Sequence, residues 1–225
     1  MNNYIFIHAA ILDYCKERLF QYLDIINKSN INVTRIFICF VGSAHKIPID
    51  LNLLKNYPHN IELCHLSHNL QDYELPTLCK LYDFCINIPN SNVLYIHTKN
   101  VGKQINVCIE DQINYMLYFN ITKWEKCINI LEKYNTCGVD LRKEPVLHYS
   151  GNFWWAKAAY ISSLPHPDDF NNLIKYPNPL NSIRHNQEFW ICYKNKNTHY
   201  SLWDCGINVY ERHLHRFTPE HYINL

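Results

Sequence analysis

The sequence predicts an α/β fold, a mixed and mostly parallel sheet flanked by helices. Short apolar runs alternate with helical patterns through the first half of the chain, as in the βαβ units that build parallel sheets. The length of 225 residues also suits one domain of this class, which can bury a core without disulfide or metal staples. We therefore expect residues 1–225 to form a single domain.

Four apolar runs of the first half are expected to be buried strands. Parallel strands that are covered by helices on both faces are near-continuous runs of large apolar side chains. The four runs are YIFIHAA at 4–10, TRIFICFVGS at 34–43, NIELCHLS at 60–67 and VLYIHTKN at 93–100.

Helical spacing of apolar residues predicts the segments between and after these strands. The expected helices cover residues 15–28, 72–88 and 111–132. Pro76 stands near the start of the second helix and Pro89 ends it. The third has the clearest amphipathic pattern in the chain and is expected to pack on the sheet.

The second half is expected to be less regular. TCGVDLR at 136–142 predicts a strand, and GNFWWAKAAYISSLP at 151–165 predicts a turn that leads into a short helix. Residues 165–186 are rich in Pro, Asn and Asp and predict a long surface loop or lid. NQEFWICYKN at 186–195 predicts a helix, and periodicity does not resolve the tail from 200 to 225.

Composition excludes several classes of protein. Lys and Arg total 21 against 20 Asp and Glu, so the chain lacks the strong positive field of nucleic-acid and anionic-membrane binders. Its ten cysteines show no Cys-x-x-Cys pair and most lie in apolar runs, which predicts buried, reduced thiols. No signal peptide or membrane span is recognisable. We expect a soluble, cytoplasmic protein that binds no nucleic acid.

Polar residues at the predicted strand ends predict a ligand site. Ligands of open α/β sheets bind beyond the carboxyl ends of the strands. The fourth run delivers His97, Thr98 and Lys99 in succession, and Lys103 follows in the next turn. An ammonium group beside a hydroxyl suits a diphosphate. The sequence has neither a P-loop nor a dinucleotide-binding motif.

Further candidates surround this expected diphosphate site. His8 and Ala9, at the end of the first strand, are expected to border a nucleotide base, and Glu74 with Thr77 to reach the base or its ribose. In HYSGNFWW, adjacent tryptophans cannot share one environment, because neighbouring side chains of a strand or helix point in different directions. One indole is expected in the core and the other, with Trp154 favoured over Trp155, on a sugar ring. The competing interpretation is that Trp154 and Trp155 are both buried in the core.

The ordered set LYIHTKN, INYMLYFNITKWEKCINIL, HYSGNFWWAKAAYISSLP and NQEFWIC resembles a group of small glycosyltransferase-like proteins of large DNA viruses and bacteria, similar to rhamnan-synthesis enzymes. The resemblance runs from about Tyr4 to Tyr210. It implies a GT-A fold and a glycosyltransferase that uses a nucleotide-diphosphate sugar, with a UDP-sugar favoured, and a glycan or protein-linked acceptor. Residues 1–110 then form the nucleotide-sugar-binding half, and residues 111–225 the acceptor-side half and tail. A viral member would work in the host cytoplasm.

Roles in glycosyl transfer follow for several residues. Glu188 is the first candidate for the base that takes the acceptor proton, as its place resembles the acidic residue of inverting GT-A enzymes; Asp204 and Asp111 come next. Ser150, Gly151 and Asn152 are expected to form a turn at the edge of the cleft, where Asn152 binds sugar hydroxyls.

Metal dependence and activity are left open by the sequence. GT-A enzymes commonly hold a divalent Mn or Mg ion on Asp-x-Asp after the fourth strand, where this chain has His97-Thr98-Lys99. We therefore expect Lys99, with Lys103, to supply positive charge in place of a metal. The alternative is a metal held by His97 with Asp111 or a C-terminal histidine such as His213. The group that the sequence resembles has the motifs HTKG and DWR, whereas this chain has HTKN at 97–100 and DQI at 111–113. Because the aromatic and arginine pair is missing, a catalytically inactive nucleotide-sugar or glycan-binding module is the second functional hypothesis. A nucleotidyltransferase on a similar sheet is the third.

Overall fold

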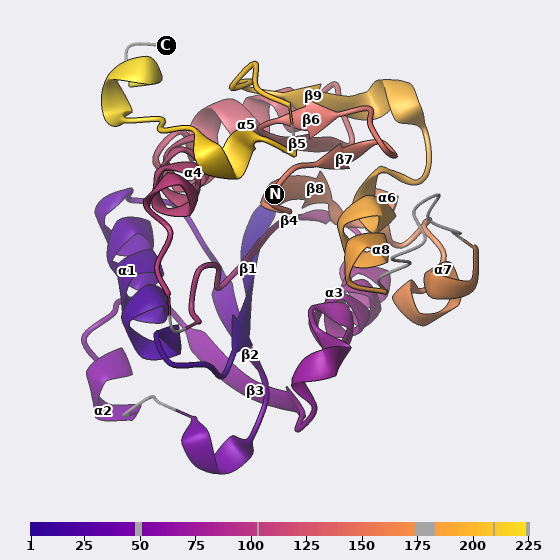
Figure 1. The fold of residues 1–225 in the computed structure, drawn as a ribbon. Helices are drawn as coiled ribbons and strands as arrows, with labels where there is room; N and C mark the ends of the chain where they lie inside the picture. Colours follow the sequence, from indigo (N-terminus) through magenta and orange to yellow (C-terminus); the bar gives the residue numbers. More distant parts are fainter. Residues whose placement is uncertain (48–50, 103, 174–182, 209, 224–225) are drawn as a thin grey trace.

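The apolar runs of the first half become the centre of one mixed sheet (Figure 1). The computed structural model describes residues 1–225 except 48–50, 103, 174–182, 209 and 224–225. Within the described residues, seven strands are arranged in the order β3-β2-β1-β4-β8-β5-β9. They are β1 Asn2–Ala10, β2 Arg35–Val41, β3 Ile61–Ser67, β4 Ser91–His97, β5 Thr136–Gly138, β8 Trp154–Lys157 and β9 His199–Ser201. The predicted α/β class with a mostly parallel sheet is confirmed.

The order of the strands reverses at β1. Strand β1 pairs in parallel with both β2 and β4, and β3 follows outside β2. The chain therefore moves outward on one side of β1 and then crosses to its other side for β4. Such a reversal of strand order leaves a crevice at the carboxyl ends of the two central strands. Beyond β4 the sheet continues with antiparallel β8, which also pairs with β5.

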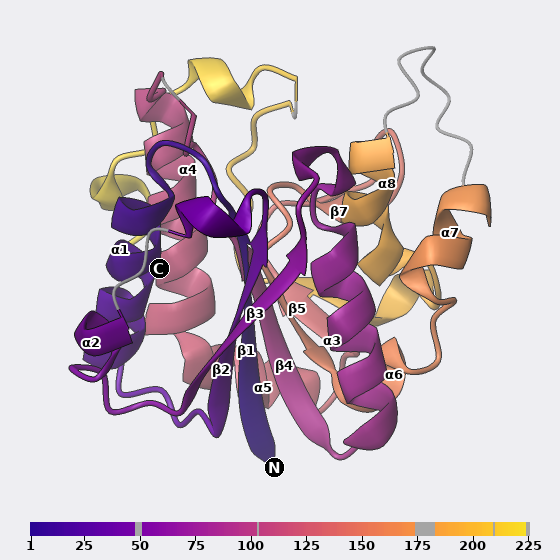
Figure 2. The same ribbon diagram turned by 90° about the horizontal axis from the view of Figure 1, so that it is seen from below.

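Helices cover both faces of the sheet (Figures 1 and 2). One face packs on α1 Cys15–Lys28, α4 Val107–Leu117 and α5 Trp124–Leu131. The other packs on α3 Leu75–Asn87, α6 Ala158–Ile161, α7 Pro167–Leu173 and α8 Ile183–Phe189. A short helix, α2 Leu51–Leu54, precedes β3, and a separate two-stranded sheet joins β6 Leu141–Arg142 to β7 His148–Tyr149.

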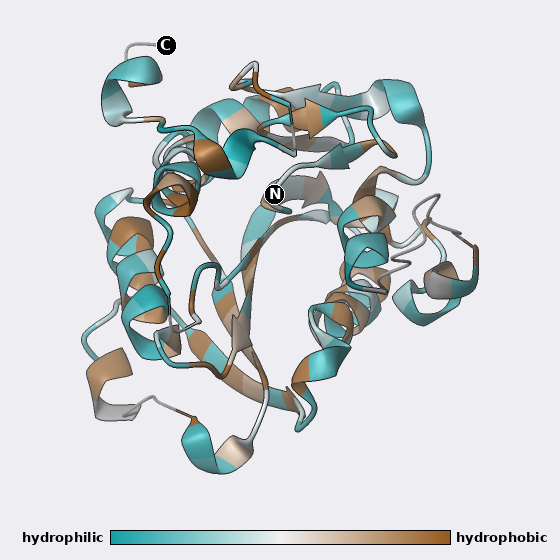
Figure 3. Ribbon diagram, viewed as in Figure 1, coloured by the Kyte–Doolittle hydropathy of each residue, from teal (hydrophilic) through white to brown (hydrophobic). Residues whose placement is uncertain are grey.

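Alternation along β1 divides its side chains between two cores. Ile5, Ile7 and Ala9 belong to the core beneath α1 and α4, whereas Tyr4 and Phe6 belong to the core beneath α3. This is the two-residue period of a strand that is buried on both faces. Figure 3 shows hydrophobic residues both in the strands and in the helices that flank them.

The predicted helix over 111–132 is interrupted. It consists of α4, a π-helical segment at Tyr118–Thr122 and α5, with a change of direction at Lys123. A π turn leaves a backbone carbonyl without its usual partner. The indole of Trp155 satisfies one such group, because its Nε1 donates to the carbonyl oxygen of Asn120 at 2.8 Å. The interruption thus depends on a partner 35 residues away in the sequence.

Three other predictions for the second half are corrected. Trp154 and Trp155 lie in strand β8, and the short helix begins only at Ala158. The single strand predicted over 136–142 is two strands, β5 and β6, separated by Asp140 in the left-handed region with φ of 51°. The loop predicted over 165–186 contains α7, while its residues 174–182 lie outside the described part of the chain.

The cysteines are reduced and mostly buried, as their positions in apolar runs predicted. All ten cysteines are free, and seven of them are buried. In the described residues, no helix has both the length and the apolar character needed to cross a bilayer.

Candidate functional site

A cavity of about 390 Å³ opens at the carboxyl ends of β1, β2 and β4. It lies where the order of the strands reverses, which is the usual ligand position in an open α/β sheet. Its walls are formed by His8, Ala10, Leu12, Val41, Leu70, Gln71, Tyr73, Glu74, His97, Thr98, Lys99, Asn100, Val101, Gly102 and Arg184.

Five of the eight predicted donor-site residues line this cavity. They are His8, Glu74, His97, Thr98 and Lys99. Ala9 does not, because alternation along β1 turns it into the core beneath α1. Thr77 is also fully buried and supports His8 from below, with its hydroxyl 2.9 Å from His8 Nδ1. Lys103 lies outside the described residues.

The two cavity histidines are neutral hydrogen-bonding groups. Burial lowers the pKa of His8 to about 4, although Glu74 acts in the opposite direction. Burial and then the charge of Lys99 lower the pKa of His97 to about 3. His97 Nε2 donates to the carbonyl oxygen of Gly151 at 2.9 Å. These imidazoles therefore provide shape and polarity at neutral pH, and positive charge must come from other residues.

Glu74 is a fixed carboxylate at the base of the cavity. Its Oε2 accepts hydrogen bonds from Tyr95 Oη at 2.6 Å and from Asn152 Nδ2 at 2.7 Å. The Oε1 atom is 3.9 Å from His97 Nδ1. Gln187 of α8 accepts a bond from the Glu74 backbone N–H at 2.7 Å, which joins α8 to the start of α3.

Lys99 and Arg184 give the cavity its positive charge. Lys99 is half-buried directly after β4, and burial lowers its pKa to about 8 despite the opposing effect of Glu188. Among the described residues, Lys99 makes no ion pair within 4 Å. Thr98 lies beside it, and its Oγ1 accepts from the Ala10 backbone N–H at 3.0 Å while its own hydrogen stays available. A diphosphate would find two cations and a hydroxyl here.

Glu188 lies near this charged end but outside the residues that line the cavity. It is half-buried on α8, and its charge raises the pKa of Lys99 and of His97. An electrostatic effect on a pKa needs proximity, so Glu188, the predicted base, lies in the same region as Lys99, the predicted partner of the diphosphate.

The predicted sugar platform is wrong. Trp154 and Trp155 both have 0 % of their surface exposed, on opposite faces of β8. Trp154 stacks on Tyr95 with the ring centroids 5.1 Å apart and donates to Asn152 Oδ1 at 2.7 Å. Adjacent tryptophans do have different environments, as predicted, but both environments are core.

The turn at 150–152 is also structural. Asn152 is buried, and its amide donates to Glu74 and accepts from Trp154, so it is enclosed and does not face a ligand. Gly151 has φ of 102°, and a β-carbon there would be 2.6 Å from Met116 Sδ. Ser150 is buried, and its carbonyl oxygen accepts from Arg212 at 3.2 Å. This turn positions Glu74 and His97 from behind the cavity.

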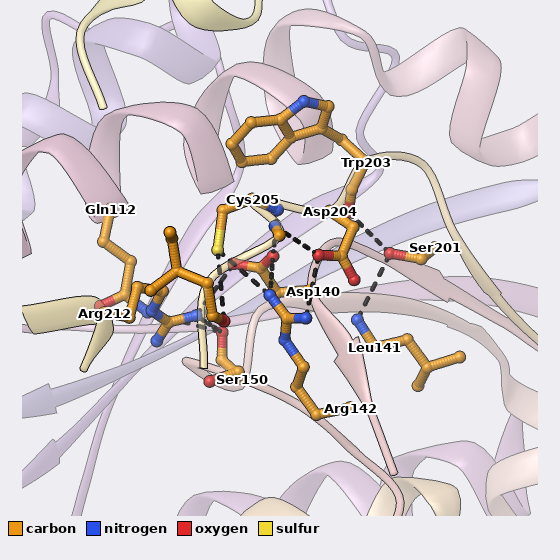
Figure 4. Close-up of polar contacts among 12 residues, drawn as sticks. Gln112, Asp140, Leu141, Arg142, Ser150, Ser201, Trp203, Asp204, Cys205 and Arg212 are labelled. Atoms are coloured by element: carbon orange, nitrogen blue, oxygen red, sulfur yellow. Dashed lines mark hydrogen bonds and ion pairs between the residues drawn. The ribbon is translucent and has the colours of Figure 1, made fainter. Parts of the chain in front are cut away.

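A buried carboxylate that sequence patterns did not reveal organises the wall beside this turn (Figure 4). Asp140 is completely buried and accepts from Tyr115 Oη at 2.6 Å, Arg212 Nη1 at 2.9 Å, Arg142 Nη2 at 3.0 Å and the Cys205 N–H at 2.8 Å. Four donors compensate its desolvation. Arg212 also lowers the pKa of Lys99, so this cluster lies within electrostatic range of the cavity.

Asp204 and Asp111 are engaged elsewhere and do not line the cavity. Asp204 is 45 % exposed and pairs with Arg142 at 2.9 Å. Asp111 accepts from Arg216 Nε at 2.5 Å and from the Phe217 N–H at 3.0 Å. Burial would raise the pKa of Asp111, but these hydrogen bonds lower it. Neither carboxylate is placed to act as the base in this cavity.

The predicted metal ligands are not brought together. His213 is exposed, and Asp111 holds Arg216. Within the described chain, the clusters of three potential ligands are Asp140, Asp204 and Cys205, and Cys79, His166 and Asp168. The first is bound by the guanidinium of Arg142, which a cation would have to displace. Among the described residues, His97 therefore shares no cluster of three potential ligands with Asp111 or His213.

Solved structures that match the chain differ widely from it in sequence. The 4-diphosphocytidyl-2C-methyl-D-erythritol synthase of Anaerococcus prevotii DSM 20548 has a TM-score of 0.51 at 12% identity, covering 90% of this chain and 86% of that one. HddC from Yersinia pseudotuberculosis gives 0.48 at 13%, covering 91% of each chain. Mouse xyloside xylosyltransferase 1, apo form, gives 0.41 at 8%, covering 97% and 95%. The first likeness shows a shared fold alone.

No curated protein matches the chain significantly. A family model described as "Domain of unknown function (DUF8361)" matches residues 5–212, which include every described residue of the cavity. The chain belongs to this family.

Proposed function

We propose that the chain is a glycosyltransferase that takes a sugar from a nucleotide-diphosphate donor and passes it to a glycan or protein-linked acceptor. The observation that carries the proposal is the pair of cations, Lys99 and Arg184, in a cavity at the reversal of strand order. A shared fold with a 4-diphosphocytidyl-2C-methyl-D-erythritol synthase supports a nucleotide-handling site but not its reaction.

The lining of the cavity supports one orientation for the proposed donor. Leu12, Val41 and Leu70 form an apolar part suited to a nucleobase, and Lys99 with Arg184 forms the part suited to the diphosphate. Glu74 Oε1 would accept a hydrogen bond from a base N–H or a ribose hydroxyl, since its other oxygen is already occupied. We propose a UDP-sugar as the first donor to test.

Charge development during transfer explains the roles of Lys99 and Glu188. When the bond between the anomeric carbon and the diphosphate oxygen breaks, its electron pair stays on the diphosphate, and a desolvated ammonium stabilises that charge. The acceptor oxygen bonds to the anomeric carbon and its proton passes to the Glu188 carboxylate. This route uses Lys99 where other GT-A enzymes are expected to use a metal.

A binding module without catalysis is the alternative function. It is favoured by the burial of both Trp154 and Trp155, which leaves no indole for a sugar in this region. The same donor site would then hold a nucleotide sugar without transferring it.

Isothermal titration with UDP-, GDP- and dTDP-sugars, in EDTA and in Mn²⁺, tests the proposal. We expect binding that persists in EDTA, weakens about 10–100-fold in Lys99→Met and is unchanged in Lys133→Met, an exposed lysine that does not line the cavity. Loss of binding in EDTA would refute the role of Lys99. Binding to all variants without release of nucleoside diphosphate, with a panel of glycan acceptors, would favour the binding module.

The ten free thiols favour a reducing compartment. We therefore propose that the protein works in the cytoplasm, of a host cell if the chain is viral.

A further inference from the structure

Helices α3 and α7 lie on the side of the sheet opposite α1 (Figures 1 and 2). Three side chains form a cluster between them. Cys79 projects from α3, while His166 directly precedes α7 and Asp168 lies in its first turn. The thiol sulfur, an imidazole nitrogen and a carboxylate oxygen all lie within 4.8 Å of one another. His166 Nδ1 is 3.6 Å from Asp168 Oδ2.

These three groups have the chemistry of a zinc site. Cysteine, histidine and aspartate are the side chains that bind Zn²⁺, and bonds of about 2.0–2.3 Å in a tetrahedron place ligand atoms about 3.3–3.8 Å apart. From the upper limit of 4.8 Å, the separations need to shrink by at most about 1.5 Å to meet that geometry. Small rotations of side chains suffice, because Asp168 is 63 % exposed and His166 is 31 % exposed.

Asp83 is a candidate fourth ligand one helical turn from Cys79, although its carboxylate is not among the atoms that lie within 4.8 Å of one another. Asp83 follows Cys79 by four residues on α3, so the two side chains lie on the same face of the helix. Both residues border a cavity of about 490 Å³, whose lining includes neither His166 nor Asp168. Burial, and then the negative charges of Asp168 and Asp83, raise the pKa of the Cys79 thiol, so only a bound cation would favour the thiolate at neutral pH.

The imidazole is already oriented for this site. The ring of Tyr82 contacts His166 edge to face, with the centroids 5.1 Å apart. The Asp168 backbone N–H approaches His166 Nδ1 at 3.3 Å, so the imidazole lone pair points toward the start of α7. An ion there would take this nitrogen in place of a weak hydrogen bond.

We propose that Cys79, His166 and Asp168 bind a zinc ion, with Asp83 or water as the fourth ligand. Binding converts the Cys79 thiol to a thiolate, forms the zinc–sulfur bond and releases the thiol proton to solvent. The ion ties α7 to α3, the helix that begins directly after Glu74. This site shares no residue with the donor cavity and does not depend on the proposed transferase activity.

Cobalt replaces zinc as a visible probe in the test. The full chain is stripped with chelator and titrated with Co²⁺, and thiolate ligation gives a sulfur-to-cobalt charge-transfer absorption that Zn²⁺ then removes. We expect one equivalent of cobalt with this absorption in the wild type. Cys79→Ser should lose the absorption and weaken zinc binding by at least about 100-fold.

Two matched variants separate this site from its competitors. Cys205→Ser removes the cysteine of the Asp140 cluster and should leave the absorption unchanged. Asp168→Asn alters an exposed ligand, so it should keep the fold while weakening zinc binding at least about tenfold. Absence of the absorption in the wild type, its persistence in Cys79→Ser or its loss in Cys205→Ser would overturn the proposal.

Discussion

Replacing Lys99 by methionine should make the protein more stable and weaken donor binding. The ammonium is half-buried, and burial lowers its pKa from 10.5 to about 8. A shift of this size corresponds to roughly 3 kcal/mol of destabilisation for the charged form, since one pKa unit is about 1.4 kcal/mol. Because the group keeps partial contact with solvent, we expect Lys99→Met to gain about 1–3 kcal/mol at pH 7. Donor affinity should fall about 10–100-fold with the loss of a charge-assisted bond.

The free energy of unfolding should depend on pH through the Lys99 ammonium. The folded protein releases the Lys99 proton near pH 8, whereas the unfolded chain keeps it until about pH 10.5. The unfolded state therefore binds more protons between these values, so wild-type stability rises across that window. The advantage of Lys99→Met should shrink over the same window, and wild-type affinity for the donor should fall.

Urea unfolding at pH 7, 8.5 and 10 measures the stability difference, and calorimetric titration with UDP-sugar measures the affinity. Lys133→Met, at an exposed lysine, is the matched control and should change neither quantity. A Lys99→Met protein that is less stable than the wild type at pH 7, or that binds donor equally well, would refute the reasoning.

Three further substitutions test other parts of the site. Glu188→Gln should lower kcat by at least about 100-fold and leave donor binding unchanged, and equal turnover would remove the residue from catalysis. Gly151→Ala should lower the urea unfolding free energy by more than about 1 kcal/mol, because a β-carbon would press on Met116 at 2.6 Å. Arg212→Met should cost about 3–5 kcal/mol by leaving Asp140 under-compensated, and adding Asp140→Asn should recover much of that loss in the same assay.

The strand ends were predictable because burial leaves a local pattern. Parallel strands covered on both faces are apolar throughout, so the first polar residue after each run marks its carboxyl end. His8 and His97 are such residues, and their backbones are paired in register on adjacent strands. Sequence alone therefore located most of one cavity wall. Arg184 was missed because it comes from a helix distant in the chain, with no motif around it.

The second half was harder to predict because its structure depends on long-range contacts. AAYI at 158–161 forms a short helix, whereas Trp154 to Lys157 form a strand, since β4 and β5 both pair with this segment. The role of Asp140 depends on Arg212, 72 residues later. A lone aspartate after a strand has no local feature that distinguishes a buried hub from an exposed turn. The same applies to the tryptophan pair, where alternation predicted two environments but not that both were enclosed.

The neighbouring indoles of β8 also provide an optical readout of how the molecule melts. Each belongs to a different apolar layer, and each donates its N–H to a different acceptor. Subtracting the emission of Trp154→Phe or Trp155→Phe from that of the wild type isolates the signal of one layer. If the Trp154 and Trp155 signals give the same denaturation curve, the apolar cores on the two faces of the sheet unfold together, as one cooperative unit.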